Sequence, residues 1–207
     1  MAKITNLIGR QVFDSRGNPT VEAEIFLDNG VSASAISPSG ASTGAFEAYE
    51  LRDKDKNNFL GKSVNIAVNN INEKILNSLK GLDSSKQSEI DKTLIDLDGS
   101  ENKKNLGANA ILAVSLANSK SAAITNKNSL FKNLGKSFSI PKPLMNIING
   151  GAHADNDLKI QEFMVRPDSA KNFIDAIQKC FLVIQNLKSL LKSKKMLTNV
   201  GDEGGFA

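Results

Sequence analysis

Three short segments dense in Gly, Ser, Asn and Asp interrupt this chain and limit what it can fold into. They are SPSGASTG at 37–44, NGGAHADN at 149–156 and NVGDEGGFA at 199–207. Segments of this composition form turns and loops, and loops on a rigid scaffold commonly carry binding and catalytic groups. The last two hold ionisable side chains, namely His153, Asp202 and Glu203. A functional site is therefore expected in these loops.

Composition places the chain among ordinary globular proteins. Of its 207 residues, 40% are hydrophobic and 23% are charged, which allows a sizeable core. No apolar run approaches the roughly 20 residues that span a bilayer, and the N-terminus lacks the apolar stretch of a secretory signal. The one cysteine, Cys180, permits no internal disulfide and fits a reducing compartment. These features predict a cytoplasmic protein.

The net charge of +4 raises the question of nucleic acid binding. Lysines are spread along the chain, and the densest cluster, within 188–195, lies at the end of a predicted helix, where cations complement the helix dipole. With one Tyr and no Trp, the chain has no basic stretch interleaved with base-stacking aromatics. A nucleic-acid partner is not expected, and the basic charge suits a small anionic substrate equally well.

The N-terminal region predicts an α+β domain that begins with a three-stranded antiparallel meander. Ile4–Phe13 reads as a strand, and Thr20–Leu27 alternates between apolar and acidic residues with the period of a strand. Asn29-Gly30 is a two-residue hairpin signal before a third strand at Val31–Ala35.

Helices are expected over the next hundred residues. An apolar repeat at helical spacing runs from Val64 to Leu79, a capping box of Ser84 and Gln87 precedes a second helix that ends at Asp98-Gly99, and 108–125 forms a closely packed central helix. The proline-containing segment at 136–143 marks a linker. The predicted domains are therefore 1–137 and 138–207.

The second domain resembles the start of an α/β (TIM-like) barrel. Short apolar strands at 144–148 and 160–165 are followed by polar loops, and an amphipathic helix with an apolar stripe from Phe173 to Leu191 follows Ser169. In such barrels the site lies at the carboxyl ends of the strands. Gln161 and Glu162 interrupt an otherwise apolar strand, and because adjacent strand residues point to opposite faces, one of them must enter a layer that should be dry.

Six motifs give the chain a resemblance to the enolase family, in that family's order and spacing. They are DSRGNPTVEAE at 14–24, PSGASTGAFEAYELRD at 38–53, LGANAILAVSLA at 106–117, NIINGGAHADN at 146–156, QEFM at 161–164 and NVGDEGGFA at 199–207. The resemblance covers the whole chain but about the first half of the family's usual length. It implies reversible dehydration of 2-phosphoglycerate to phosphoenolpyruvate, with magnesium stabilising the enolate.

The resemblance also implies roles for individual residues. Glu203 is the expected general acid for the departing hydroxyl, and a carboxyl group fills that role only if burial or a neighbouring carboxylate disfavours its ionised form. Glu162 is the expected neighbour. Gln161, Glu162 and His153 are expected to contact the substrate, and His153 can also aid proton transfer. Taken alone, Glu203 and His153 are more typical of ordinary loop positions. An edge strand with one polar face remains the alternative for Gln161 and Glu162, although a functional site is the favoured interpretation of that pair.

Two further expectations concern magnesium and assembly. Ser42 is expected in a mobile loop, where it contributes oxygen ligands to a second magnesium ion that arrives with substrate. By the same resemblance, the principal magnesium ligands and the lysine base follow the last motif and are absent from this chain. Arg16 lies in a segment that the family uses at its dimer interface, so a homo-oligomer is expected. A cell-surface or secreted pool is compatible with the resemblance.

Three readings remain open at this point: an enolase represented by its N-terminal portion, a non-catalytic fragment or interaction module that keeps this half of the fold, and a basic nucleic-acid-binding protein. The first two differ in whether coding sequence continues past Ala207. The 207 residues alone are expected to be inactive, because the metal carboxylates and the base are missing, and an unclosed barrel presents unpaired strand edges.

Overall fold

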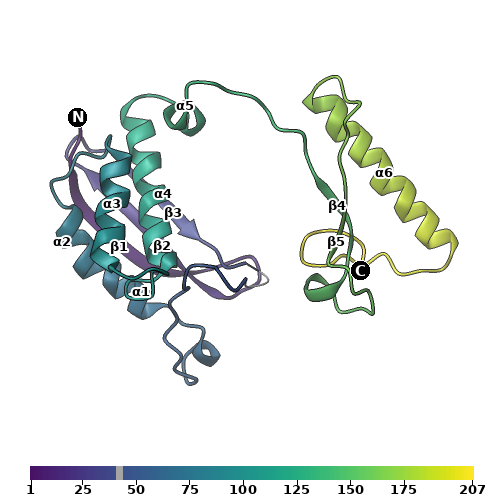
Figure 1. The fold of residues 1–207 in the computed structure, drawn as a ribbon, viewed down its shortest axis with the longest axis horizontal. Coiled ribbons are helices and arrows are strands. Elements are labelled where there is room, and N and C mark those ends of the chain that lie inside the picture. Colours follow the sequence, from purple (N-terminus) through teal and green to yellow (C-terminus); the bar gives the residue numbers. More distant parts are fainter. Residues whose placement is uncertain (41–43) are drawn as a thin grey trace. The chain divides into compact units, whose positions relative to one another are not determined.

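The computed structural model describes residues 1–40 and 44–207 and divides the chain into two compact units, Met1–Ser137 and Phe138–Ala207 (Figure 1). The first unit is an antiparallel sheet with helices, and the second contains a two-stranded sheet and one long helix. None of the helices in the described part of the chain combines the length and apolarity needed to cross a membrane.

The sheet of the first unit has the order β1-β2-β3, in agreement with the predicted meander. Its strands are β1 (Ile4–Phe13), β2 (Pro19–Leu27) and β3 (Ser32–Ser37). The alternation in β2 is confirmed, because Val21, Ala23, Ile25 and Leu27 are buried, and the partly exposed glutamates lie on the other face. Gly30 has a φ of +82° in the turn between β2 and β3, which explains the Asn-Gly pair there.

Helices cover one face of this sheet (Figure 1). In chain order, the helices of this unit are η1 (Phe59–Gly61), α1 (Asn65–Asn70), η2 (Ile71–Ile75, a π-helical turn), α2 (Leu76–Leu79), α3 (Gln87–Asp98), α4 (Ala108–Thr125) and α5 (Leu130–Leu134). Of these, α1, η2, α2 and α4 contact the sheet, whereas α3 packs against α2 and α4, and α5 packs against α4. The central helix α4 has its predicted bounds and packs against β2 and β3. Its small residues Ala110, Ala113 and Ala117 are buried, which lets the helix approach the sheet closely.

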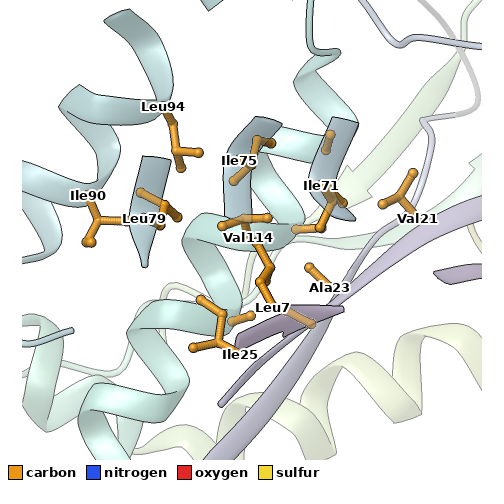
Figure 2. Packing of buried hydrophobic residues seen from close by; sticks show 14 of the residues in the cluster. Leu7, Val21, Ala23, Ile25, Ile71, Ile75, Leu79, Ile90, Leu94 and Val114 are labelled. Carbon is orange, nitrogen blue, oxygen red and sulfur yellow. The ribbon is translucent and has the colours of Figure 1, made fainter. Parts of the chain in front are cut away.

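The core lies between this sheet and the helices (Figure 2). Side chains from β1 and β2 meet side chains from η2, α2, α3 and α4, and the largest are fully buried. The labelled members are Leu7, Val21, Ala23, Ile25, Ile71, Ile75, Leu79, Ile90, Leu94 and Val114. The helical repeat predicted from Val64 to Leu79 is therefore confirmed as a core-facing stripe, although a π-helical turn interrupts the α-helix.

The expected capping box at the start of α3 is wrong. The residue before the helix is Lys86, and no side chain caps the first turn. Gln87 instead donates its amide to Asp91 Oδ1 at 2.9 Å and to the carbonyl of Ser115 at 3.1 Å. Asp91 lies on α3 itself, whereas Ser115 lies on the neighbouring helix α4, so Gln87 links the two helices instead of forming a local cap.

Asp98 organises the loop after α3. Its carboxylate accepts hydrogen bonds from the backbone N–H groups of Ser100 at 3.0 Å, Asn105 at 3.1 Å and Leu106 at 2.7 Å. Burial raises the pKa of Asp98, but the Ser100 hydroxyl and these N–H groups outweigh that effect and hold the pKa below its ordinary value.

We expect Asp98→Ala to lower the free energy of unfolding by about 3 kcal/mol, because it leaves buried donors without their charged acceptor. The folded-state pKa is depressed, so this contribution is present above the ordinary carboxyl pKa of about 3.9 and is lost as pH falls through the lower folded-state value. Urea unfolding should therefore show a gap between wild type and variant that narrows below about pH 4. A difference in stability that stays constant down to pH 2 would contradict the role assigned to the Asp98 carboxylate.

The control is Asp96, an exposed residue on the same helix that pairs with Lys92. Its replacement by alanine should lower the free energy of unfolding by less than about 1 kcal/mol.

The second unit contains β4 (Met145–Asn149), η3 (Gly151–His153), β5 (Glu162–Val165) and α6 (Phe173–Ser193). Strands β4 and β5 pair antiparallel, and Ile148 of β4 forms a parallel bridge to Phe206. This start differs from the all-parallel pattern of the standard (β/α)8 barrel. Asn172 caps α6, because its side chain accepts the N–H of Asp175 at 2.9 Å.

The apolar stripe predicted on α6 is only partly buried. Ala176 and Cys180 are buried, whereas Phe173 and Ile177 are 45% and 39% exposed. The helix is therefore placed as predicted, but burial reaches fewer positions on its apolar face than the periodicity suggests.

Candidate active site

Two loops of the second unit meet beyond the end of β4. In the first, Gly151 adopts a φ of +54°, and the N–H of His153 donates to the carbonyl of Gly150 at 3.0 Å. This tight turn folds the chain back, so that the His153 side chain is 4% exposed. The only histidine of the chain is therefore buried, although it lies in a polar loop.

The second loop is the GDEGG turn at 201–205, which is tied to the first by backbone and side-chain contacts. The N–H of Asp202 donates to the carbonyl of His153 at 3.0 Å. The N–H of Gly205 donates to Asn149 Oδ1 at 2.8 Å, and the N–H of Gly201 donates to the carbonyl of Gly205 at 2.9 Å. These contacts fix the turn that carries Glu203 against the end of β4.

Gly201 is required by space. A Cβ atom there would lie 2.5 Å from the carbonyl oxygen of His153 and 2.8 Å from the Cβ of Asn149. We expect Gly201→Ala to destabilise the turn by about 1–3 kcal/mol, because backbone must move to admit the methyl group. Amide hydrogen exchange at Asp202 and Gly205 should become faster. Unchanged exchange at both amides would contradict this expectation, because it would show that the turn accommodates the methyl group without moving. Gly135→Ala is the control, since a Cβ atom there has no neighbour closer than 4.0 Å.

Three ionisable side chains converge between these loops. His153 Nδ1 lies 3.2 Å from Glu162 Oε1 and 3.3 Å from Glu203 Oε2. On the other side of the ring, His153 Nε2 lies 2.8 Å from Gln161 Nε2. The structure thus brings together all four residues of this unit that the sequence singled out, from positions up to 50 apart in the chain. Glu162 is partly buried and Glu203 is 43% exposed, so the carboxylates reach from the interior to the surface.

Sequence reasoning missed two asparagines on β4 that support this cluster. Asn146 Nδ2 donates to Glu203 Oε2 at 3.3 Å, and Asn149 holds Gly205 as described above. Among the described residues, Asn146 Oδ1, Asn149 Nδ2 and His153 Nδ1 are buried and have no directed hydrogen bond. Buried polar atoms without partners are costly in a purely structural site. A signal was available, because two asparagines in a short apolar strand are unusual.

The loop expected to carry Ser42 belongs to the first unit, and Ser42 itself lies outside the described residues. The segment before it is held by arginines. Arg16 donates to the carbonyls of Ser39 at 2.9 Å and Gly40 at 3.1 Å, and Arg52 donates to Ser39 Oγ at 2.8 Å. Arg16 therefore has an intramolecular role in this chain, beside its expected place in an interface segment.

Comparison with known proteins shows which proteins this chain is similar to. The family model described as the N-terminal domain of enolase matches residues 4–134, and the one described as the C-terminal TIM barrel domain of enolase matches residues 137–207. The chain belongs to the enolase family. It is 56% identical over 209 aligned residues to an enolase from Pelagibacter ubique (strain HTCC1062), and the match covers 100% of this chain and 50% of that protein. The chain thus spans about half the length of the curated relative it matches.

Membership in the enolase family implies a metal cofactor. The trio of His153, Glu162 and Glu203 offers one ligand atom each within 4.8 Å of one another. Magnesium prefers an octahedron of oxygen ligands, and an imidazole nitrogen suits transition metals better. The trio therefore does not fit magnesium, and its chemistry is better described as that of proton-carrying groups.

The trio places two carboxyl groups and one imidazole, all groups that can carry a proton, within 4.8 Å of one another. Because Glu203 is the more exposed of the two, it is the carboxyl group that a bound molecule can reach. Glu162 and His153 lie behind it and can stabilise either protonation state.

Proposed function

We propose that this chain forms the N-terminal part of an enolase that reversibly converts 2-phosphoglycerate to phosphoenolpyruvate and water. The observation that carries the proposal is the contact of His153 Nδ1 with both Glu162 and Glu203, at 3.2 and 3.3 Å. It gathers the residues that the family resemblance assigns to the leaving-group side of the reaction. The proposal makes the protein a lyase of glycolysis, and we place it in the cytoplasm.

In this proposal Glu203 donates its proton to the hydroxyl that leaves as water. Glu162 shares the proton network of the leaving hydroxyl, and Gln161 and His153 contact the substrate. A positioned acid of this kind contributes typically 10²–10⁴-fold to a rate. Asn146 donates to Glu203 and orients its carboxyl group, which gives this asparagine a supporting part in the same step.

Magnesium and assembly complete the proposal. Magnesium supplies the positive charge that stabilises an enolate, and Ser42 is proposed as a ligand of an ion that binds with the substrate. Because the trio of His153, Glu162 and Glu203 offers an imidazole nitrogen and only two carboxylates, we do not propose these residues as magnesium ligands. We also propose a homo-oligomer, with the segment around Arg16 at the interface.

A chimera tests the proposal directly. Residues 1–207 of this chain would be joined to the part of the Pelagibacter ubique enolase that follows the matched segment, and phosphoenolpyruvate formation would be measured with magnesium. Turnover within about tenfold of the intact Pelagibacter enzyme is expected. A folded chimera without turnover would favour the alternative, a non-catalytic interaction module.

A further inference from the structure

The histidine at the centre of the site has different chemical partners at its two ring nitrogens. Nε2 lies 2.8 Å from the amide nitrogen of Gln161. Nδ1 lies within 3.3 Å of a carboxylate oxygen from each of Glu162 and Glu203. A neutral imidazole carries one proton, and which nitrogen holds it is set by these partners.

At the Nε2 end, the partner is a donor. The amide nitrogen of Gln161 carries two hydrogens and accepts no hydrogen bond. A hydrogen bond at 2.8 Å therefore requires His153 Nε2 to accept, with its lone pair free. In a neutral ring this leaves the proton on Nδ1.

At the Nδ1 end, an independent argument gives the same result. Carboxylate oxygens are acceptors, and two of them face Nδ1. A lone pair on Nδ1 would point at two negatively charged oxygens, whereas an N–H is attracted to both. Nδ1 makes no directed hydrogen bond to either oxygen, so an N–H at Nδ1 is attracted to both carboxylates without being fixed by one of them.

We propose that Gln161 is a positioning residue that fixes the Nδ1–H tautomer of His153, so that the ring proton faces Glu162 and Glu203. In this role Gln161 acts on His153 by hydrogen bonding, in addition to the substrate contact proposed for it above. Gln161 directly precedes Glu162, the first residue of β5. The same short segment of backbone therefore positions both the amide donor at Nε2 and one of the two carboxylate acceptors at Nδ1.

One consequence rests on the proposed function. With Nδ1 protonated, His153 donates toward both carboxylates and cannot accept the acid's proton at that nitrogen. The proton intended for the leaving hydroxyl therefore stays on the carboxyl pair. His153 in this tautomer stabilises whichever carboxylate is ionised, and Gln161 keeps it in that role.

Nitrogen-15 NMR of the 207-residue chain tests the tautomer without any turnover. Because His153 is the only histidine, its two ring nitrogens give the only imidazole signals. At about pH 8, above the ordinary histidine range, we expect Nδ1 to appear protonated and Nε2 unprotonated. A protonated Nε2, a doubly protonated ring, or an averaged pair of signals would each overturn the proposal. Failure here leaves the proposed enolase activity untouched, since that is measured separately as turnover.

Two substitutions at Gln161 test its part. Gln161→Glu replaces the donor by an acceptor of the same shape, and we expect the ratio of Nδ1–H to Nε2–H to fall at least tenfold. Gln161→Met keeps the length and removes the donor, and we expect averaged signals. Retention of the wild-type signals in either folded variant would show that the carboxylates alone set the tautomer, and would refute the role of Gln161. Gln178→Glu, on the exposed side of α6, adds the same charge elsewhere in the unit and should leave the His153 signals unchanged.

Discussion

Glu203→Gln is expected to lower the turnover of the chimeric enolase by about 10²–10⁴-fold, which corresponds to about 3–5 kcal/mol in the activation free energy. The amide keeps the shape of the side chain and its contact with Asn146, but its N–H groups are not acidic enough to transfer a proton to a leaving hydroxyl. Steady-state measurement of phosphoenolpyruvate formation checks the effect.

Asp202→Asn is the matched control for this variant. Asp202 lies in the same turn, is exposed, and contributes its backbone N–H to the carbonyl of His153. Its replacement removes one carboxylate charge next to Glu203 and should change turnover by less than about threefold, because surface charges act weakly. Equal losses in both variants would mean that the charge of the turn, and not the acid, supports the reaction.

Leu94→Ala is expected to lower the free energy of unfolding of the first unit by about 4 kcal/mol. Leu94 is fully buried in the core shown in Figure 2, and truncating a buried leucine removes its transfer free energy and leaves a cavity. Leu97 lies on the same helix and is 38% exposed, so Leu97→Ala should cost less than about 2 kcal/mol. Denaturant unfolding of both variants checks the difference, and equal costs would contradict the position assigned to Leu94.

The fold of the first unit could be predicted closely because its signals are local. Alternation in β2 and the Asn-Gly turn predict a hairpin, since a shift by one residue would expose the apolar face. The bounds of α4 follow from its small apolar residues between Gly107 and Asn126. The cap of α3 could not be predicted, because Gln87 bonds to Ser115 on a helix that is remote in sequence.

The second unit was predicted less completely. The apolar stripe of α6 indicates a helix, but periodicity does not reveal how many apolar positions find a partner, and several remain exposed. Ile174, Phe181 and Leu182 are at least 50% exposed. The antiparallel pairing of β4 and β5 was also not visible in the pattern, because both strands are short apolar runs whose direction composition does not encode.

At the candidate site, the residue types were predictable and their arrangement was not. The resemblance to enolases pointed to His153, Glu162 and Glu203, while the loop composition alone favoured surface positions for them. Their meeting depends on contacts across about 50 residues, such as that between Asn149 and Gly205. Asn146 stands out in the sequence as a polar residue in a short apolar strand, but its role could not be predicted, because that role depends on its hydrogen bond to Glu203.

Hydrogen exchange at carbon 2 of 2-phosphoglycerate, measured together with net dehydration in the Glu203→Gln chimera, tests the central claim most directly. If Glu203 serves the leaving hydroxyl and another residue removes the carbon-bound proton, exchange with deuterated solvent should persist at near the wild-type rate while dehydration falls by about 10²–10⁴-fold. A fall of both by the same factor would contradict the account, because Glu203 would then be required for proton abstraction itself.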